Sequence, residues 1–166
     1  MCANQIEPMN IVEITQYSDE VLKSLNNLLP QLLPSVSPLL ETDLVEIIQS
    51  EFSHLLMAKK DGQYYGSLTL TVVKIPTGSK VWIEDAVVNE NMRGKGVGKL
   101  LIEHAVGLAE ELGVQAINLT SSPSRKSANA LYKRIGFELR ETNVYRYKNH
   151  ITKVLSRQIL HSEDSS

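Results

Sequence analysis

A glycine-rich turn between a strand and a helix constrains this chain more than any other feature. An apolar strand ending at Val88 runs into the loop Met92-Arg93-Gly94-Lys95-Gly96-Val97-Gly98-Lys99, which opens directly into an amphipathic helix. Glycine permits positive φ and close approach of a ligand to the backbone, and the free N–H groups at a helix N-terminus bind anions. Arg93, Lys95 and Lys99 add positive charge. We therefore expect a phosphate or pyrophosphate to bind at this turn.

Hydrophobic periodicity on either side of the turn predicts a mixed α/β layer protein. The expected order is β-α-α-β-β-β-α-β-α-β-β, which gives a predominantly antiparallel sheet of about six to seven strands flanked by about four helices. The predicted strands are 10–15, 55–59, 64–73, 81–88, 116–120, 137–141 and 144–148. The predicted helix boundaries are a cap at Ser18 with an end at Pro30, a start at Thr42, an end at Gly113, and a cap at Ser122-Pro123 with an end at Gly136.

Length, charge and cysteine content exclude several classes of protein. The 166 residues fit one domain over 1–161, in which 151–160 has helical spacing, followed by a frayed tail at 162–166. A net charge of −2 without a block of like charges argues against binding to nucleic acid or to an anionic membrane. Cys2 is the only cysteine and the four histidines are scattered, so we expect a reducing, cytoplasmic location and no metal.

We compared the glycine-rich turn with the sequence patterns of three known types of phosphate-binding loop. A dinucleotide-binding fingerprint needs glycine at Lys99, and a Walker A loop needs Ser or Thr at Leu100, so neither matches. The third pattern is Arg or Gln, two residues, Gly, one residue, and Gly or Ala. Arg93, Gly96 and Gly98 satisfy it without exception.

With this loop and a second motif, the chain resembles the GNAT superfamily of acetyl-CoA-dependent N-acetyltransferases. The first block is Ile83-Glu84-Asp85-Ala86-Val87-Val88 followed by the loop at 93–98. The second is Ala128-Asn129-Ala130-Leu131-Tyr132-Lys133-Arg134-Ile135-Gly136-Phe137, which is similar to the family's Ala-x-x-Leu-Tyr-x-x-x-Gly-Phe helix. The resemblance covers the chain from the first strand to about Lys148.

The resemblance implies that acetyl-CoA binds as the acetyl donor, without a metal. Many family members carry Asn seven residues before the tyrosine, where this chain has Arg125, while Asn129 lies on the same helix face and offers an alternative polar contact. The residues expected to bind the cofactor are Val87, Val88, Arg93, Gly94, Lys95, Gly96, Val97, Gly98, Lys99, Arg125 and Asn129.

The chemistry of acetylation needs a base for the amine and an acid for the thiolate. An amine of pKa near 10.4 is neutral in about one molecule in 2,500 at pH 7, so a nearby carboxylate is useful. Glu84 and Asp85 interrupt an apolar strand, and alternation would put them on opposite faces. We favour Glu84 as the base and assign Asp85 to substrate binding, against the alternative that either acid only pairs with a lysine. The resemblance makes Tyr132 the general acid and a strand N–H near Val87 or Val88 the oxyanion donor, although Tyr132 also fits simple packing.

The expected substrate is a small primary amine. The proline-broken segment from Leu28 to Leu40 would cover the site, and Glu41 and Asp43 would join the acids that line it. Two alternatives stay open: an acetyltransferase acting on protein N-termini or lysines, and a CoA-binding module without turnover. The sequence leaves a homodimer open and predicts no nucleic-acid or membrane partner.

Overall fold

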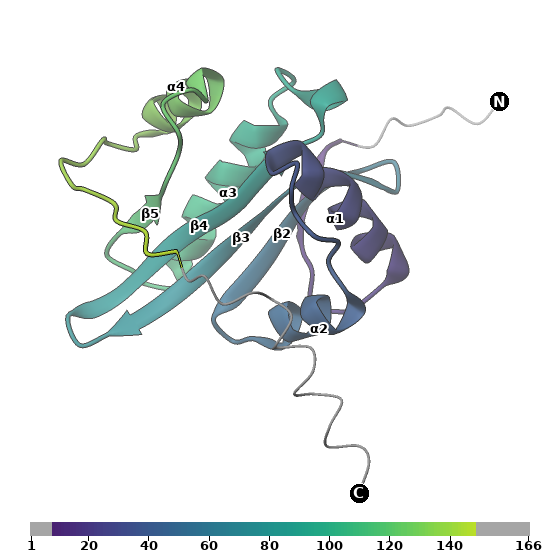
Figure 1. Cartoon of the computed structure of the whole chain (residues 1–166), viewed down its shortest axis with the longest axis horizontal. Helices are drawn as coiled ribbons and strands as arrows, with labels where there is room; N and C mark the ends of the chain where they lie inside the picture. Colours follow the sequence, from purple (N-terminus) through teal and green to yellow (C-terminus); the bar gives the residue numbers. More distant parts are fainter. Residues whose placement is uncertain (1–7, 149–166) are drawn as a thin grey trace, which may run out of the picture.

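One mixed sheet organises the computed structural model, which describes residues 8–148 (Figure 1). The strands lie in the order β1-β2-β3-β4-β5. Neighbours pair antiparallel except β4 and β5, which are parallel. Their bounds are β1 (Asn10–Glu13), β2 (Ser53–Lys60), β3 (Gln63–Ile75), β4 (Gly78–Val88) and β5 (Ile117–Leu119). The predicted mixed α/β layer architecture is confirmed, but the described residues form five strands rather than six to seven.

Helices cover both faces of this sheet. Figure 1 shows α1 and α2 in front of the strands, α3 behind them, and α4 above β5. Two hydrophobic cores follow, one between the sheet and α1 and α2 and the other between the sheet and α3 and α4. The bounds are α1 (Asp19–Leu32), α2 (Glu41–Gln49), a 3₁₀ turn (Glu90–Met92), α3 (Val97–Glu111) and α4 (Lys126–Ile135).

The α1 helix begins as predicted but does not end at Pro30. The Ser18 hydroxyl accepts a hydrogen bond from the Val21 N–H at 3.2 Å, which caps the N-terminus. Pro30 lies inside the last turn, and the helix continues to Leu32. Proline removes only its own N–H, its φ is already helical, and Leu33 donates to the Leu29 carbonyl at 2.9 Å. The extension brings the end of α1 to the edge of the site described below.

The start of α4 also differs from the prediction. Ser122 and Pro123 form a turn, in which the Arg125 N–H donates to the Ser122 carbonyl at 3.0 Å, and the helix begins at Lys126. The Asn129 side chain donates to the same carbonyl at 2.9 Å and closes this turn. Arg125 therefore occupies the N-cap position. The C-terminus is as predicted, with Gly136 in the left-handed conformation at φ 111°.

The two strands predicted at 137–141 and 144–148 do not form in the described structure. Alternating apolar residues are present, but Leu139 and Tyr147 are each 91% exposed. A strand needs backbone partners, and no residue of 138–148 joins the five-stranded sheet. One side-chain contact, from Arg140 to Asn118 at 3.4 Å, links the segment to β5. The predicted helix at 151–160, the tail at 162–166 and Cys2 lie outside the described residues.

Membrane-spanning helices and clusters of metal-ligating side chains are both absent from the part of the chain that the structure describes. No helix in residues 8–148 combines the length and the apolar character needed to cross a bilayer. The same residues contain no group of three or more His, Cys, Asp or Glu side chains placed to hold a metal ion.

Gly66 provides a test of how closely β3 and β4 pack. A Cβ at this position would lie 2.9 Å from the Val87 carbonyl oxygen and 3.0 Å from the Leu101 side chain. We expect Gly66→Ala to destabilise the protein by about 1–3 kcal/mol, because one neighbour is backbone that cannot move aside cheaply. Chemical denaturation measures the change.

The matched control is Gly107→Ala in α3, where a Cβ meets nothing within 4 Å. Helix propensity and reduced freedom of the unfolded chain should stabilise this variant by about 0.5–1 kcal/mol. Equal stability of the two alanine variants would contradict the close approach at Gly66.

Candidate active site

A bulge in β4 sets the geometry of the site. Thr69 pairs with Glu84 and Ser67 pairs with Val87, so two residues of β4 stand opposite one of β3. One of the two is Asp85, which has the left-handed φ of 50° that few residues other than glycine adopt. Such strain persists only where the surrounding structure holds it, and it concentrates at functional sites.

The bulge reverses the alternation of side chains along β4. Before it, Ile83 packs in the core beneath α3; after it, Ala86 and Val88 pack against that core while Val87 joins the core beneath α1. Without the extra residue, Val87 would share the face of Ile83. The alternation on which the prediction for Glu84 and Asp85 rests is therefore interrupted once between Ile83 and Ala86.

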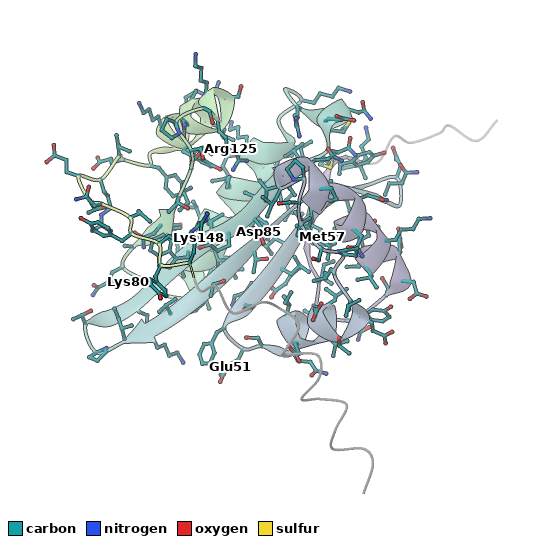
Figure 2. The ribbon with its side chains drawn as sticks, in the orientation of Figure 1. Glu51, Met57, Lys80, Asp85, Arg125 and Lys148 are labelled. Carbon is teal, nitrogen blue, oxygen red and sulfur yellow. The ribbon has the colours of Figure 1, made fainter. Side chains whose placement is uncertain are left out.

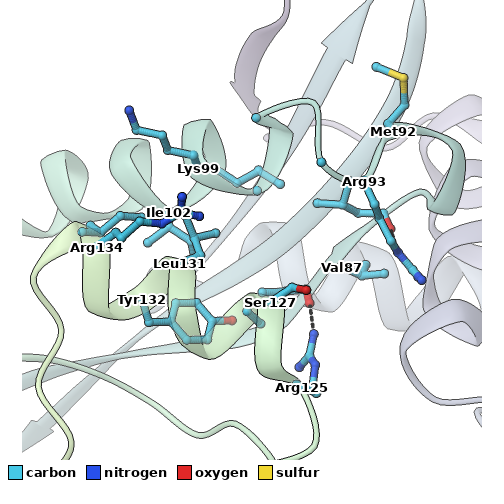
Figure 3. A pocket seen from close by; sticks show the side chains of 18 of the residues that line it. Val87, Met92, Arg93, Lys99, Ile102, Arg125, Ser127, Leu131, Tyr132 and Arg134 are labelled. Carbon is cyan, nitrogen blue, oxygen red and sulfur yellow. Dashed lines mark hydrogen bonds between the residues drawn. The ribbon is translucent and has the colours of Figure 1, made fainter.

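The bulge lies where β4 loses its neighbour on the other side. β5 pairs with β4 only from Val81 to Ile83, so the β4 edge beyond Ile83 faces open space toward α4. Two arginines bind carbonyls on this edge: Arg93 Nε donates to Val88 O and Arg125 donates to Ala86 O, each at 3.2 Å. Figure 3 shows both arginines beside the strand. The open edge therefore already interacts with cationic side chains from the glycine-rich loop and from α4.

The glycine-rich loop continues from this edge into α3. Gly94 and Gly96 have φ of 76° and 86°, and Gly96 is the N-cap of the helix. The first hydrogen bond of the α3 helix runs from the Leu100 N–H to the Gly96 carbonyl at 3.0 Å. The N–H groups that precede Leu100 in the first turn therefore have no partner within the helix. The N-terminus of α3 thus has the backbone geometry on which the predicted anion site depends.

A cavity of about 1050 Å³ lies between this loop, the β4 edge and α4 (Figure 3). Its charged lining is almost entirely cationic, because five basic side chains face one acid, Glu103. Lys99 forms a 3.6 Å ion pair with that acid. The basic residues are Arg93, Lys99, Arg125, Lys126 and Arg134. Volume and charge together suit a long polyanionic ligand.

Most of the residues predicted to bind the cofactor line this cavity. They are Val87, Val88, Arg93, Gly94, Gly96, Gly98, Lys99 and Arg125, together with the predicted general acid Tyr132. Three predicted residues are not in its lining. Val97 is buried in the core at 2% exposure, Lys95 Nζ lies 3.8 Å from the Met92 sulfur, and Asn129 closes the turn before α4.

The lining also contains residues outside the predicted cofactor set, and sequence reasoning missed two of its cations, Lys126 and Arg134. Gln31 and Leu32 reach the cavity because α1 continues past Pro30, and Gln31 Oε1 accepts a hydrogen bond from the Glu90 N–H at 2.9 Å. Lys126 and Arg134 belong to α4, where their basic charge was a usable signal. Of the predicted cover from Leu28 to Leu40, only Gln31 and Leu32 line the cavity, while Leu28 is a core residue at 1% exposure.

A second, smaller cavity of about 160 Å³ adjoins the first. Four residues line both: Leu32, Ala86, Arg125 and Tyr132. The remaining lining is Ile83, Glu84, Asp85, Leu119 and Thr120, so both acids contribute to the lining of one space. Glu41 and Asp43 are absent from the lining of both cavities; the Asp43 carboxylate instead accepts from the Leu40 N–H at 3.0 Å and caps α2.

Tyr132 stands where the two cavities meet. Its side chain is 8% exposed, and its ring packs edge to face on Phe137 with centroids 6.0 Å apart. Burial raises the pKa of the phenol, and the nearby positive charge of Arg125 opposes that rise. The hydroxyl therefore stays protonated at neutral pH and is available as a proton donor.

A family model described as the acetyltransferase (GNAT) family matches residues 22–137, which include the bulge, the glycine-rich loop and α4. The chain belongs to the GNAT acetyltransferase family. The resemblance inferred from the two sequence blocks is confirmed.

Two curated relatives from Bacillus subtilis (strain 168) match part of this GNAT chain. An uncharacterized N-acetyltransferase, YhdJ, is 33% identical over 95 residues, which span 55% of the chain and 66% of the relative. A putative [ribosomal protein bS18]-alanine N-acetyltransferase is 26% identical over 93 residues, 56% of the chain and 59% of the relative. The chain thus spans about three fifths to two thirds of these relatives.

The fold of the GNAT chain also matches solved structures. The aminoglycoside N-acetyltransferase AAC(6')-Iy in complex with CoA superposes with a TM-score of 0.71 at 20% identity. The match covers 88% of this chain and 98% of that one. At this identity the likeness establishes the shared fold.

The geometry of the large cavity fits coenzyme A. A Cβ at Gly98 would lie 3.4 Å from the Leu131 side chain and 3.6 Å from that of Val88, so any side chain here would fill the space between β4 and α4. The free N–H groups of the first turn of α3 suit a pyrophosphate, and the surrounding cations suit the phosphates of such a ligand.

Proposed function

We propose that this GNAT chain transfers the acetyl group of acetyl-CoA to a primary amine of a small molecule. The observation that carries the proposal is the junction of the two cavities. A large cationic cavity meets a small cavity lined by two acids, and Ala86 and Tyr132 lie in both linings. One space suits a polyanionic donor, the other a cationic acceptor, and their boundary is where transfer would occur.

The proposed donor site uses the glycine-rich loop and its cations. The N–H groups of the first turn of α3 up to Lys99 bind the pyrophosphate, whereas the Lys95 N–H already donates to the Met92 carbonyl at 3.3 Å. Arg93 is already oriented by its bond to the Val88 carbonyl. The open β4 edge beyond Ile83 leads from that site toward Tyr132. Acetyl-CoA supplies a thioester, which is activated toward attack by a neutral amine.

Backbone geometry favours Val88 over Val87 as the donor that stabilises developing negative charge. Asn89 donates to the Tyr65 carbonyl of β3 at 2.8 Å, so its N–H points toward β3. In a strand, neighbouring residues point their N–H groups to opposite edges. The Val88 N–H therefore points toward the open edge, as its carbonyl does where it meets Arg93. Such fixed donors are an effective form of transition-state stabilisation.

We assign the proton transfers of the reaction to three side chains. Glu84 or Asp85 takes the proton from the amine, directly or through water, since both line the small cavity. Glu84 remains our first choice, with Asp85 binding the substrate. Tyr132 returns a proton to the departing thiolate, for which its buried and protonated phenol is suited.

Substitution of the two acids distinguishes base from binding residue. We expect Glu84→Gln to lower kcat about 100-fold at pH 7, within the range for general base catalysis, with partial recovery as the pH rises and neutral amine accumulates. Asp85→Asn should mainly raise the KM of the amine. A pH profile of initial rate for both variants measures the difference, and the reverse pattern would exchange the two roles.

The size of the small cavity supports a small acceptor over a protein. About 160 Å³ lies below the roughly 300–1,000 Å³ of pockets for drug-sized ligands, and Leu32 lines part of it. The fold shared with an aminoglycoside N-acetyltransferase supports the same class. The bS18-alanine relative supports the alternative, acetylation of a protein N-terminus. We propose a cytoplasmic enzyme without nucleic-acid or membrane partners and leave a homodimer open.

A competition assay tests the acceptor class. Free CoA release is measured with a panel of primary amines, with an alanine-terminated peptide and with a lysine peptide. The proposal expects the highest kcat/KM for one of the small amines. A kcat/KM for either peptide well above that of every amine would replace the small-molecule proposal with the protein acetyltransferase.

A further inference from the structure

On the basis of the proposed function, we propose that the acceptor amine also carries an anionic group, a carboxylate or a phosphate, which Arg125 binds. The small cavity has both signs of charge in its lining. Glu84 and Asp85 lie on β4, and Arg125 stands opposite them at the start of α4, with Thr120 contributing a hydroxyl. Figure 2 labels Arg125 and Asp85 on these two elements. A site for a simple amine would need only the acids.

The guanidinium of Arg125 has N–H donors that make no hydrogen bond within the described structure. One N–H group binds the Ala86 carbonyl at 3.2 Å, as the dashed line in Figure 3 marks. A guanidinium has five N–H donors in a rigid fork, and this fork matches the oxygens of a carboxylate or phosphate. The bond to Ala86 fixes the position of the fork and leaves most of its donors available for a ligand.

The acids of the small cavity do not neutralise Arg125. Within residues 8–148, the two ion pairs are His54 with Glu13 and Lys99 with Glu103, so Arg125 pairs with neither Glu84 nor Asp85. Two acids on β4 and a cation at the start of α4, in the lining of one cavity and without an ion pair between them, present two separate charge sites. A ligand with an ammonium group and an oxyanion would complement both.

The two arginines contact different residues of β4, and this difference separates their roles. Arg93 binds the Val88 carbonyl beside the glycine-rich loop and lines only the large cavity. Arg125 binds the carbonyl of Ala86, two residues nearer the bulge, and lines both cavities. We therefore assign the cofactor phosphates to Arg93 and the acceptor's anion to Arg125.

Matched pairs of amines test the proposal. The panel contains glycine, β-alanine and 4-aminobutyrate, each beside its amide, and phosphoethanolamine beside ethanolamine. Calorimetry measures their binding to the protein–CoA complex, and free CoA release measures turnover. We expect at least one anionic amine to bind about 10-fold or more tightly than its neutral counterpart, the scale of a hydrogen bond to a charged group. The carboxylate and phosphate pairs distinguish the two anions.

Two substitutions assign the preference to Arg125. Arg125→Gln should remove the preference for the anionic amine, and Arg125→Lys should keep part of it because the charge remains. Amine binding to both variants is measured at saturating CoA, because Arg125 also lines the large cavity and its substitution is expected to weaken the cofactor as well. Equal weakening of anionic and neutral amines at saturating CoA would overturn the proposal and make Arg125 a cofactor residue.

The two readouts separate this proposal from the proposed function. If an anionic amine binds in a manner that depends on Arg125 but releases no CoA, the acceptor site stands and catalysis of acetyl transfer is refuted. If only neutral amines are acetylated, the reaction stands and the anion site is refuted.

Discussion

Gly98→Asp should raise the Kd of acetyl-CoA at least about 100-fold, roughly 2.8 kcal/mol of binding energy, while the protein remains folded. The substitution puts a carboxylate into the first turn of α3, among the amides assigned to the pyrophosphate. Its Cβ would already lie 3.4 Å from Leu131, so the side chain is directed into the space between the helix and β4. Charge repulsion and lost volume act in the same direction. Calorimetry with acetyl-CoA measures the effect.

The matched control for this variant is Gly107→Asp. It makes the same change in charge in the same helix, at a position where a Cβ meets nothing within 4 Å and which lines neither cavity. Its affinity for acetyl-CoA should stay within about 2-fold of the wild type, because a distant exposed charge is screened. Retained affinity in the folded Gly98→Asp variant would refute the assignment of the donor site.

Tyr132→Phe should lower kcat by about 10- to 100-fold with little change in stability. The substitution keeps the ring that packs on Phe137 and removes only the hydroxyl at the junction of the cavities. Burial raises the pKa of this phenol above its usual value near 10. The wild type should therefore keep its proton donor throughout pH 6–9, and the deficit of the variant should be constant across that range.

Tyr64→Phe is the matched control for the loss of a phenol. Tyr64 packs against the core beneath α1, and its hydroxyl lies 3.5 Å from Lys59 Nζ, away from both cavities. Turnover of this variant should equal that of the wild type. Unchanged turnover in Tyr132→Phe as well would make Tyr132 a packing residue, and the thiolate would then leave without help from the phenol.

Local signals in the sequence were sufficient for most of the fold. The Asp61-Gly62 pair predicts a tight hairpin, and both residues have the positive φ that such a turn requires. The Ser18 cap and the Gly136 terminus were readable for the same reason, since each is fixed by a few neighbouring residues. The glycine-rich loop belongs to this class, because its geometry depends on its own glycines.

Features set by distant partners were not predictable from local patterns. The alternation in 137–148 is that of a strand, yet the segment lacks a backbone partner in the described structure. Pro30 marks a helix end in isolation, but α1 tolerates it within its last turn, which ends at Leu32. The start of α4 depends on a turn that Asn129 closes from inside the helix.

The bulge in β4 is the feature that most limited prediction of the site from the sequence. Residue types were enough to select Glu84 and Asp85, but the extra residue against β3 beside them, which interrupts the alternation, has no signal in the local pattern. The parting of β4 and β5 beyond Ile83 is likewise a tertiary property, because it depends on the short length of β5. The residue types of the candidate site were therefore readable from the sequence, while their spatial arrangement was not.

The most direct test of the proposed function is the stoichiometry of one reaction. The protein is incubated with acetyl-CoA and the best amine of the panel, and mass spectrometry of the N-acetylated product is compared with a titration of free thiol. Our account predicts equal amounts of product and free CoA, with no acetyl group on the protein, because transfer occurs directly at the junction of the two cavities. Binding of acetyl-CoA with no product from any amine or peptide would contradict it and identify a CoA-binding module without turnover.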